Sequence, residues 1–409
     1  MVKKIVYFVD LFPSKSETWV QNEIFSLMQQ GFEIKIFSRD KKPSVTLQDN
    51  SLFVKNTEYP KGLFLIYFFK NPIRNLSLFY KIIKAIRKDF WSDTKGTRGK
   101  IQVLKDLLLY IHKWDKINIF NPDLIVVHFA DARADFALFH NLLYKTPYLI
   151  KIHAHDVFRR QNLFKLKIDR AYKILSISNY NIEFIKNRDK DIDISKFNVH
   201  HCGISINKYE FKSVPRNNNI PIILSVGRLT NMKGFDTLIK ASSELHKKNL
   251  THRIIIAGYG PDKEYLVNLS NHLKLQNVVE FKDYCSPEEV KNLLYLSDLF
   301  ILASRFDKKN KTQDGIPVAI MEAMSTGLPV ITTNTSGIPE LIEDNVNGFL
   351  VPPDDPLKLS NKIEEIFAMS ESKLNKIVIN ARLKIENDFN LDKLNIDLKK
   401  LFEKVPESI

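Results

Sequence analysis

The sequence predicts an α/β protein with two domains, each built around a doubly wound parallel sheet. Short apolar and β-branched runs recur along the chain, and most are continuously apolar, which is typical of strands buried on both faces of a parallel sheet. Helical stretches separate these runs, as in βαβ units. The runs form two series, and 409 residues are long for a single hydrophobic core.

The expected elements follow in order along the chain. The first series predicts strands at residues 4–10, 32–38, 123–129, 147–153 and 173–178. The second series predicts strands at residues 221–227, 252–258, 278–284, 298–304 and 329–334, and clear helical stretches lie at 17–30 and 235–249. A polar segment with two prolines and a run of asparagines separates the two series. We therefore expect an N-terminal domain at 1–210, a C-terminal domain at 211–388, and a helix within 389–409 that returns to the first domain.

Composition sets limits on the class of protein. With 44% hydrophobic and 26% charged residues, the chain has the make-up of a soluble globular protein. Only two cysteines occur, Cys202 and Cys285, which excludes a disulfide framework and a cysteine zinc site and suits a reducing cytoplasm. No run of 18 apolar residues is present, so no membrane span is expected. The net charge of +14 fits nucleic acid, an anionic membrane or an anionic substrate, and composition does not choose among them.

One strand end carries two cations suited to a diphosphate. In open α/β sheets, ligands bind beyond the carboxyl ends of the strands. The segment SVGRLTNMKGFDTLIKA places Arg228 and Lys233 between such an end and the start of a helix, although two solvated loop cations are an equal alternative. At the next strand end, Gly258 and Gly260 are followed by Lys263, where a dinucleotide fingerprint needs a third glycine. A nicotinamide cofactor therefore lacks its main support.

Two carboxylates frame a helix start in the segment DGIPVAIMEAMSTG. Pro317 fits a first helical turn, so the N–H groups of Val318 and Ala319 should be free to bind an anion. Glu322 lies about one turn further and can accept two hydrogen bonds from a vicinal diol such as a ribose, while Asp314 can reach a second polyol. Each acid alone is better explained as a cap, a salt-bridge partner or a loop residue. Their spacing favours a shared ligand.

Taken together, these motifs resemble a known family. SVGRL with KGFDTLIKA, AGYGP, DGIPVAIMEAMSTGLPVITT and SGIPELIEDNVNGFLVPPDD resemble the second domain of the retaining glycosyltransferases of family 4, which have the GT-B fold. The N-terminal segment FPSKSETWVQNEI resembles the colanic-acid and amylovoran branch of bacterial exopolysaccharide enzymes. The resemblance covers most of the chain. It implies two Rossmann-like domains that face each other across a cleft.

The resemblance also assigns roles to residues. Arg228 and Lys233 would bind the donor diphosphate, Glu322 the ribose, and Asp314 the transferred sugar. The further donor-binding residues implied are Gly203, Gly315, Ile316, Val318 and Ala319. In YLIKIHAHDVF the family pattern H-G-Y-D falls on residues 153–156, so His153 is expected near the primary hydroxyl of the sugar, with His155 in place of an aromatic residue. Acceptor-side residues are Glu17, Thr18, His128 and Asp156, although a structural role explains His128 as well.

The chain differs from the family pattern at two places, and the resemblance implies a reaction without a metal. The first acid of the family's E-x7-E motif is Asp314 here, one methylene shorter than glutamate, and the glycine-rich first loop of many relatives is replaced by residues 12–18. The expected reaction is transfer of a hexosyl group from a nucleoside-diphosphate sugar with retention. Protein cations would stabilise the leaving group, so no metal or other cofactor is expected. The triplet Asp191–Asp193 resembles a metal-binding DxD motif but fits a solvated loop better.

Residues 54–116 form a basic and aromatic insert in the first domain. From Lys81 to Lys116 the chain has ten Lys or Arg and four Asp or Glu. The stretch FYKIIKAIRKDFW places five apolar residues at helical spacing, Phe79, Ile82, Ile83, Ile86 and Phe90. This face could dock on anionic lipid, near a lipid-linked acceptor, or pack on the first sheet, and the sequence leaves both open. We therefore expect a cytoplasmic protein, with peripheral contact at the inner membrane as one option.

Other functions remain open from sequence alone. The same two-domain fold could serve a nucleotide-sugar epimerase or a phosphorylase, although no second carboxylate base or pyridoxal-binding lysine is recognisable. A non-catalytic protein that binds RNA or membrane would explain the net charge but leave the strand-end motifs unexplained. The sequence gives neither the sugar, the base of the nucleotide, the acceptor nor the linkage.

Overall fold

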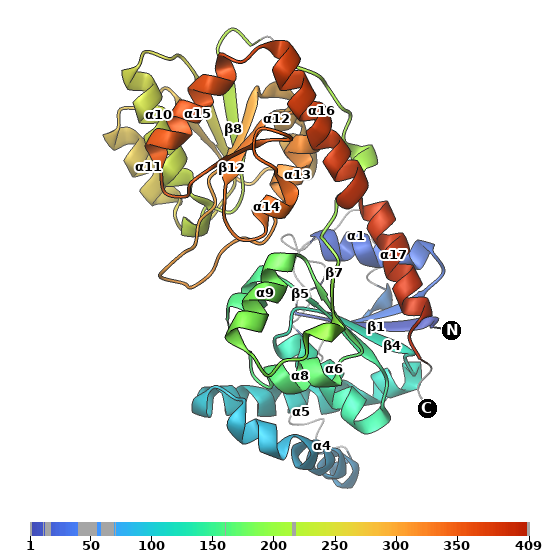
Figure 1. Cartoon of the computed structure of the whole chain (residues 1–409). Helices are drawn as coiled ribbons and strands as arrows, with labels where there is room; N and C mark the ends of the chain where they lie inside the picture. The colour runs from blue at the N-terminus through green and yellow to red at the C-terminus, as the bar shows by residue number, and fades with distance from the viewer. Residues whose placement is uncertain are drawn as a thin grey trace. The chain divides into compact units, whose positions relative to one another are not determined.

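The chain folds into two compact units, which we describe from a computed structural model. The structure describes residues 2–10, 12, 18–39, 55–58, 69, 71–159, 161–214 and 218–406. One unit comprises residues 1–200 and 395–409, and the other comprises residues 201–394 (Figure 1). The division after residue 200 lies ten residues before the predicted boundary at 210, and the division after residue 394 lies six residues after the predicted boundary at 388. The earlier division has a local cause, because Ile204 forms a parallel bridge with Asn390 inside the second unit.

The first unit is built on a seven-stranded parallel sheet. Its strands lie in the order β3-β2-β1-β4-β5-β6-β7. Their bounds are β1 Lys4–Val9, β2 Glu33–Ser38, β3 Thr57–Glu58, β4 Leu124–His128, β5 Tyr148–Ile152, β6 Lys173–Ser176 and β7 Phe197–Val199. In register, Ile5 of β1 lies between Ile34 of β2 and Leu124 of β4. The chain therefore winds outward in both directions from β1 and β4.

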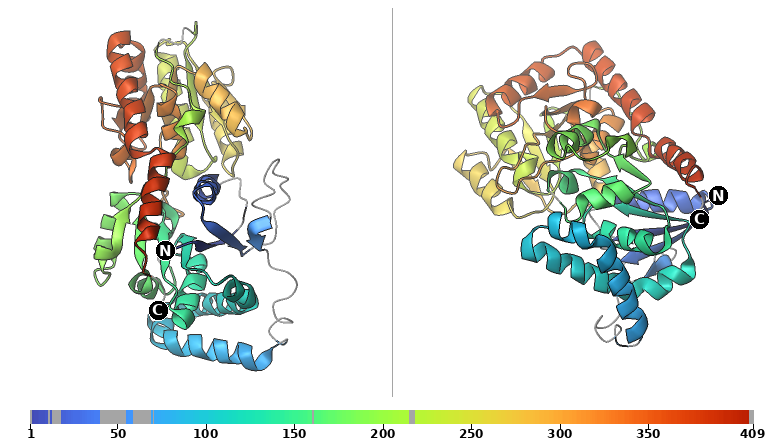
Figure 2. Two further views of the ribbon diagram at one scale, coloured as in Figure 1. Left: turned by 90° about the vertical axis from the view of Figure 1, so that its right-hand side faces the viewer. Right: turned by 60° about the horizontal axis from the view of Figure 1, so that its bottom comes forward.

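Helices cover both faces of this sheet. One face carries five helices, α4 Pro72–Ser92, α5 Gly96–Phe120, α6 Ala132–Tyr144, α8 Phe164–Arg170 and α9 Asn179–Arg188. The remaining described helical elements of this unit are α1 Thr18–Gln29, α7 Ala154–Phe158, the 3-10 turn η1 Ile194–Lys196 and α17 Leu391–Glu403. On the opposite face α1 packs beside the end of α17, where Phe32 contacts Phe402 with ring centroids 5.8 Å apart. Figures 1 and 2 show α4 and α5 side by side, outside α6. The last residues of the chain thus complete the first core.

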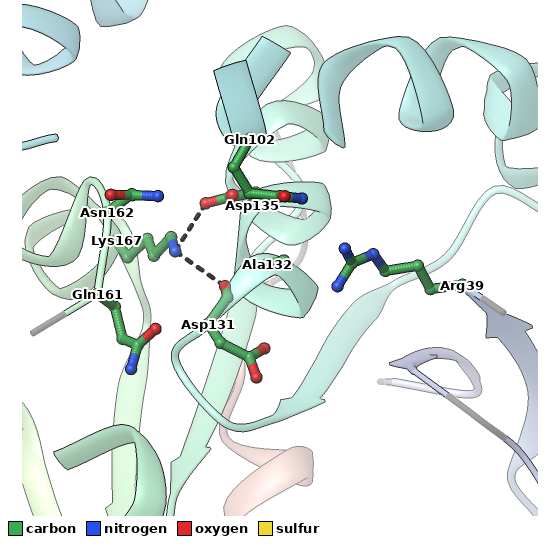
Figure 3. Close-up of a pocket in the computed structure, with 8 residues that line it drawn as sticks. All are labelled: Arg39, Gln102, Asp131, Ala132, Asp135, Gln161, Asn162 and Lys167. Atoms are coloured by element: carbon green, nitrogen blue, oxygen red, sulfur yellow. Dashed lines mark hydrogen bonds and ion pairs between the residues drawn. The ribbon is translucent and has the colours of Figure 1, made fainter. Parts of the chain in front are cut away.

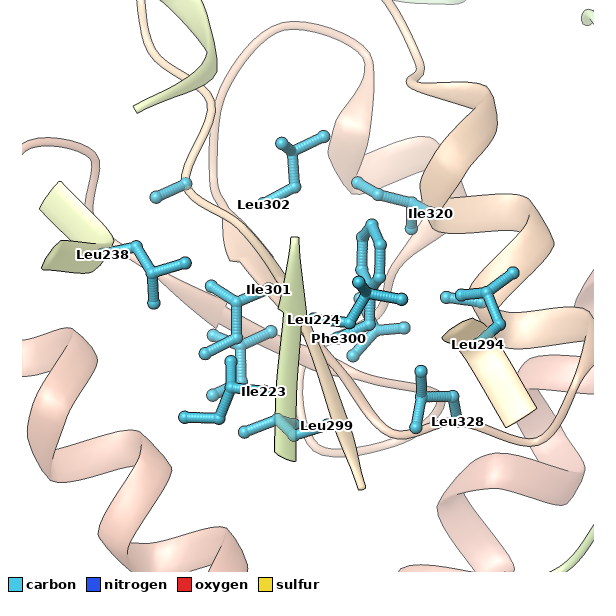
Figure 4. Packing of buried hydrophobic residues seen from close by; sticks show 14 of the residues in the cluster. Ile223, Leu224, Leu238, Leu294, Leu299, Phe300, Ile301, Leu302, Ile320 and Leu328 are labelled. Carbon is cyan, nitrogen blue, oxygen red and sulfur yellow. The ribbon is translucent and has the colours of Figure 1, made fainter. Parts of the chain in front are cut away.

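The second unit repeats this architecture with six parallel strands in the order β10-β9-β8-β11-β12-β13. The strands are β8 Ile222–Val226, β9 Arg253–Ala257, β10 Val279–Lys282, β11 Leu299–Leu302, β12 Val330–Thr333 and β13 Phe349–Val351. The helices are η2 Ile206–Lys208, η3 Asn231–Lys233, α10 Phe235–Lys247, α11 Lys263–His272, α12 Pro287–Leu296, α13 Val318–Ser325, α14 Ile338–Leu341, α15 Pro356–Phe367 and α16 Glu371–Asp388. Figure 4 shows Leu238 of α10 on one side of β8 and β11, with Leu294 and Ile320 on the other.

The predicted α/β class with two doubly wound sheets is confirmed, and all ten predicted strands are present within a residue or two of their expected ends. Three edge strands were missed, namely β3, β7 and β13, which have two or three residues each and pair on one side only. Such short segments carry too few residues for a periodic signal. The predicted helices correspond to α1, α10 and α17.

Candidate active-site residues in the two units

Two residues predicted to bind the donor meet at the switch point of the second sheet. β8 and β11 are neighbours in the sheet, and the chain winds away from them in opposite directions, which is where ligands bind in open α/β sheets. Lys233 ends η3 after β8, and Asp314 lies in the segment after β11. The Lys233 Nζ and Asp314 Oδ1 atoms are 2.9 Å apart, and Ser304 Oγ donates to Asp314 Oδ2 at 2.8 Å. Both oxygens of Asp314 are therefore engaged.

A glycine allows this loop to reach its position. Gly234 has a φ of +66°, and an added Cβ would lie 1.8 Å from the carbonyl oxygen of Ala303 at the end of β11. No side chain fits there, and the left-handed backbone is itself unfavourable for other residues. Arg305 fixes the same loop, since its main-chain N–H donates to Met232 O and its guanidinium pairs with Asp236 of α10 at 2.7 Å. These contacts therefore fix the backbone of the loop that holds Lys233.

Arg228, the second predicted phosphate cation, has a different environment. It follows β8 directly, and its side chain is exposed. Within the described part of the chain, no ion pair or hydrogen bond of its guanidinium occurs. A cation without a protein partner at a strand end can bind an anionic ligand without first giving up another contact.

The helix α13 begins between the two acids as the sequence predicts. Pro317 occupies the N-cap position, one residue before the expected first turn, and no side chain caps the helix. Val318 and Ala319 are half-buried, Gly315 is half-buried and Ile316 is buried. An uncapped helix start with free N–H groups binds anions well. The backbone N–H groups here therefore add to the positive charge of Arg228 and Lys233 in the segment after β8.

Glu322 lies one turn into α13 and has a partner that the sequence did not reveal. Its Oε1 accepts a hydrogen bond from Tyr209 Oη at 2.8 Å. Burial raises the pKa of the Glu322 carboxyl, and the Tyr209 hydrogen bond partly offsets this rise. Burial, and then the charge of Glu322, raises the pKa of the Tyr209 phenol. Tyr209 orients one carboxylate oxygen and leaves the other available for a diol.

In the first unit, His153 belongs to a buried polar cluster. His153 Nε2 lies 3.2 Å from His128 Nδ1, and His128 Nε2 lies 3.0 Å from Glu23 Oε1. Glu23 also accepts from Tyr7 Oη and from Lys151 Nζ, each at 3.0 Å. Tyr7 lies in β1, Glu23 in α1 and His128 at the end of β4. Lys151 lies in β5 and His153 follows it, so the cluster joins four elements. Trp19 covers it, with its ring centroid 4.4 Å from that of His153.

The charges of this cluster fix the positions of its protons. The Lys151 ammonium and His128 hold the pKa of Glu23 well below its usual range despite burial, so Glu23 is ionised. Burial lowers the pKa of His128 and, more strongly, of His153, so both rings are neutral. His128 must then donate from Nε2 to Glu23, and His153 donates from Nε2 to His128 Nδ1. The His153 side chain also closes a capping box at the start of α7.

Asp156 and Phe129 shape the same region. Asp156 accepts from the N–H groups of His153 and Ala130, both at 2.7 Å, and thereby ties together the turns after β4 and β5. Burial raises its pKa to about 7. Phe129 adopts a φ of +76°, an uncommon conformation for a bulky residue, and its ring lies 4.5 Å from that of His153. Strain of this kind is frequent at functional sites.

The comparisons agree with this geometry. Residues 207–384 match the family model of glycosyl transferases group 1. This segment belongs to that family. The chain is 27% identical to WcaL of Escherichia coli K12, named for colanic acid biosynthesis, with 98% of this chain and 99% of that one covered. It is 28% identical to AmsK of Erwinia amylovora, an amylovoran biosynthesis glycosyltransferase, with 95% and 96% covered.

Solved structures confirm the fold of the whole chain. The structure of Alr3699/HepE from Anabaena in complex with UDP has a TM-score of 0.71, 17% identity, and coverage of 98% of this chain and 99% of that one. Two Rossmann-like parallel-sheet domains of this kind are the GT-B fold, as predicted.

Some predicted residues have other surroundings in this fold than expected. Gly203 packs closely on the segment before α17, and an added Cβ would lie 2.6 Å from Phe389 O, so packing alone explains the glycine. His128 is buried with both ring nitrogens engaged, as expected for a structural histidine. Glu17 and the side chains of Thr18 and His155 lie outside the described residues. The donor role of Gly203 and the acceptor roles of the others stay predictions.

The triplet that resembles a metal-binding motif has a structural role in the first unit. Asp191 and Asp193 are exposed, and Asp193 caps η1 by accepting from Ser195 N at 2.9 Å. Among the described residues, no three His, Cys, Asp or Glu side chains come close enough together to hold a metal ion. In the same part of the chain, no helix has both the length and the hydropathy needed to cross a membrane.

Sequence reasoning missed Tyr209, Glu23 and Lys151. Tyr209 stands in the polar segment between the two predicted domains, and nothing in its neighbours marks it. Glu23 and Lys151 lie 128 positions apart, inside an apolar helix face and an apolar strand. A charged residue within an apolar stretch was the available signal, since it needs a buried partner.

Proposed function

We propose that the chain is a retaining hexosyltransferase that moves a sugar from a nucleoside-diphosphate sugar to a saccharide acceptor in the synthesis of a bacterial surface polysaccharide. The observation that carries this proposal is the Lys233–Asp314 pair beside the uncapped start of α13 at the switch point of the second sheet. The names of WcaL and AmsK support the polysaccharide, and the UDP complex of HepE supports the donor class.

The leaving group determines what the donor site must do. When the bond between the sugar C1 and the phosphate oxygen breaks, negative charge grows on the nucleoside diphosphate. The ammonium of Lys233, the exposed guanidinium of Arg228 and the N–H groups of Val318 and Ala319 would stabilise that charge as it develops. In this proposal the positive charge comes from the protein, with neither a metal nor another cofactor.

The two acids would hold the neighbouring parts of the donor. Sugar and phosphate are adjacent in a nucleotide sugar, and the distance of 2.9 Å between Lys233 Nζ and Asp314 Oδ1 supports a proposed phosphate contact of Lys233 beside a proposed sugar contact of Asp314. Glu322, oriented by Tyr209, would accept the ribose hydroxyls. His153, held by His128, would lie near the primary hydroxyl of the sugar. The acceptor hydroxyl would then attack C1 on the face that the leaving group vacates, and its proton would pass to the departing phosphate oxygen.

A thermal-shift panel with UDP, GDP, ADP, CMP, NAD and pyridoxal phosphate tests this proposal. At about 100 times its dissociation constant, a nucleotide should stabilise the protein by about 2.7 kcal/mol. We expect a shift with one nucleoside diphosphate, strongly reduced in Arg228→Ala but kept in Arg253→Ala, an exposed arginine at the opposite end of β9. No shift with any nucleotide would contradict the proposal, and a shift with NAD or pyridoxal phosphate alone would favour an epimerase or a phosphorylase.

We also infer peripheral contact with the cytoplasmic face of the inner membrane, through a face of α4 other than the one the sequence suggested. The predicted apolar face packs inward, with Ile82 and Ile86 buried in the core and Phe79, Ile83 and Phe90 against it. The opposite face exposes four large apolar side chains, Ile73, Leu76, Tyr80 and Trp91, which are 57% to 86% exposed. Their spacing of three, four and eleven residues places them in one stripe.

The positive charge around this stripe favours an anionic partner. Lys81, Lys84, Arg87 and Lys88 are exposed on the same helix. Exposed apolar side chains flanked by lysine and arginine are typical of helices that lie in the surface of an anionic bilayer. A lipid-linked acceptor would reach the enzyme at such a surface. The occupant we propose is therefore anionic lipid.

Vesicle flotation tests the membrane contact. We expect the protein to float with phosphatidylglycerol vesicles and not with phosphatidylcholine vesicles, and to lose flotation at high salt. Ile73→Ser with Trp91→Ser should abolish binding, whereas Ile379→Ser with Leu383→Ser, an equally polar change on the exposed face of α16, should not. Equal flotation with both lipids, or with both variants, would contradict this surface.

A further inference from the structure

A polar cavity opens at the carboxyl edge of the first sheet and belongs to none of the sites described above. Its volume is about 260 Å³ (Figure 3). Arg39 enters it from the end of β2, and Asp131 enters it from the turn after β4. Asp10, at the end of the intervening β1, accepts from Arg39 Nη1 at 3.3 Å. The cavity therefore lies at the switch point of this sheet, the usual ligand position in open α/β folds.

The lining is polar almost throughout. It consists of three amides, two carboxylates, two cations and one methyl group. The amides are Gln102, Gln161 and Asn162, and the carboxylates are Asp131 and Asp135. Pockets for drug-sized ligands are mostly apolar and somewhat larger. This cavity instead offers many hydrogen-bond donors and acceptors in the space of one small, hydroxyl-rich molecule.

The two cations in the lining already have protein partners. Lys167 Nζ pairs with Asp135 Oδ1 at 2.6 Å and donates to the carbonyl oxygens of Ala130 and Asp131. Arg39 lies between Asp10 and Asp106. The positive charges are thus balanced within the protein, so the cavity has no excess charge to attract an anion. A neutral ligand fits this balance better than a phosphate does.

The amides are held in place before any ligand arrives. Gln102 Nε2 donates to both carboxylate oxygens of Asp106 at 3.0 Å, and Gln161 Nε2 donates to Arg159 O at 2.8 Å. Asn162 Oδ1 accepts from Lys95 N at 3.0 Å. Side chains that are already fixed lose little conformational entropy on binding. The cavity is therefore a pre-formed site.

We propose that this cavity binds one neutral sugar ring of the acceptor saccharide. The inference rests on the proposed function, because only a glycosyltransferase has an acceptor to place. Carboxylates and amides are the groups that pair with neighbouring hydroxyls, and Arg39 faces the two amides of residues 161–162 across the cavity (Figure 3). Gln102 comes from α5, which lies in the basic insert. The insert thus contributes to acceptor specificity as well as to the proposed membrane surface.

A short chain of contacts links the cavity to the histidine cluster within the same unit. Arg133 Nη2 pairs with Asp131 at 2.6 Å, and its guanidinium lies 3.9 Å from the ring centroid of Phe129. The Phe129 ring in turn contacts His153, with centroids 4.5 Å apart. Asp131 of the cavity lining is thus linked through Arg133 to the strained Phe129. The neighbouring sugar of the acceptor would then extend toward His153.

Saturation-transfer NMR with the full chain and a panel of methyl glycosides tests this site. The panel holds methyl glucoside, galactoside, mannoside, fucoside and N-acetylglucosaminide, each measured without nucleotide. Ala132→Leu fills the cavity from the first turn of α6, and Gln161→Ala removes one half-buried amide. We expect at least one glycoside to bind, with affinity reduced about tenfold in either variant, as loss of a hydrogen bond predicts. Ala85→Leu, at an exposed position of α4, should bind normally.

The possible outcomes separate this inference from the proposed function. Binding that is unchanged in both variants, or absent for every glycoside while a nucleotide still shifts the melting temperature, overturns the cavity proposal alone. Binding that inorganic phosphate displaces shows an anion site and overturns it too. Glycoside binding that both variants lose supports the cavity, and this support holds even if no nucleotide binds, a result that would contradict the donor site.

Discussion

Asp314 carries the residue-level difference from the family motif, where a glutamate is usual. Its oxygens are taken by Lys233 and Ser304, so the shorter side chain is fixed on both sides. The loop after β11 brings the shorter acid within 2.9 Å of the Lys233 ammonium. Asp314 therefore orients Lys233 in addition to its proposed contact with the sugar.

The substitution Asp314→Asn separates these two roles. It removes the negative charge that holds Lys233 and keeps the shape of the side chain. We expect the nucleoside diphosphate to bind at least as tightly as in the wild type, because Lys233 is released for the phosphate, while the rate of sugar transfer falls about 100-fold or more. Calorimetry and single-turnover kinetics measure the two quantities. Loss of nucleotide affinity together with an unchanged rate would contradict both roles.

Glu23 is the anchor of the histidine cluster. In Glu23→Gln the buried ammonium of Lys151 loses its counter-charge and the neutral ring of His128 loses a charged acceptor, so we expect the free energy of unfolding to fall by about 3–5 kcal/mol. Glu183→Gln is the matched control, since Glu183 pairs with Lys186 on the exposed face of α9 and should change stability by less than about 1 kcal/mol. Denaturant titration gives both values. Equal stabilities of the two variants would mean that the cluster is not held by charge.

Sequence predicts single residues only where a local motif marks them. Arg228, Lys233, Asp314 and Glu322 each stand in a recognisable strand–loop–helix context, and the structure brings Lys233 and Asp314 into direct contact. Tyr209 meets Glu322 across 113 positions of the chain, in a contact that only the folded unit defines. The motifs that hold Lys233 and Asp314 could therefore be recognised in the sequence, whereas the hydrogen bond that orients Glu322 could not.

At the scale of elements, apolar patterns predict which segments form strands and helices, but they do not predict what each helix face contacts. Spacing identified the apolar face of α4 but left open whether it packs on the first sheet or on lipid, and the outer stripe of apolar residues is too sparse to stand out in the sequence. The cavity of the first unit was likewise hidden, because its lining comes from five separate segments between residues 39 and 167. Packing of distant elements creates both features.

The loop between η3 and α10 depends on one glycine. Gly234→Ala would place a methyl group against Ala303 O in a left-handed backbone, so we expect a loss of more than about 2 kcal/mol in unfolding free energy and weaker nucleotide binding. Gly31→Ala has a positive φ but open space, and strain alone should cost about 1 kcal/mol. Thermal melts with and without nucleotide compare the two. Similar losses would show that the close approach to β11 does not matter.

The contact between α5 and α6 should respond to pH. Burial, and then repulsion from Asp135, raises the pKa of Asp106 to about 8 from an ordinary value of 3.8. As pH rises from 4 to 8, the unfolded chain releases this proton while the folded protein keeps it, so stability is lost. Asp106→Asn has no such proton and should gain stability relative to the wild type by roughly 1 kcal/mol per pH unit. Denaturant titrations at pH 5, 6, 7 and 8 measure the slope, and a constant difference would contradict it.

At the scale of the whole molecule, the chain has two units with separate cores, and each unit carries different candidate functional features. The second unit carries the family match and the proposed donor residues, and the first carries the histidine cluster, the cavity and the apolar stripe of α4. The chain returns to the first unit at residue 395, so the first core includes residues that follow the second unit in the sequence. Sequence predicted this return from a helical stretch left over after the second sheet.

The most direct test is calorimetric titration of the nucleoside diphosphate selected by the thermal panel into wild type, Glu322→Ala and Glu343→Ala. Glu343 is an exposed acid of the same unit outside the proposed site. If Glu322 binds the ribose, its loss should weaken the nucleotide by at least about tenfold, as expected for hydrogen bonds to a charged group, and Glu343→Ala should bind like the wild type. Unchanged affinity in a folded Glu322→Ala variant would mean that the switch point of the second sheet does not hold a nucleotide sugar in the way proposed.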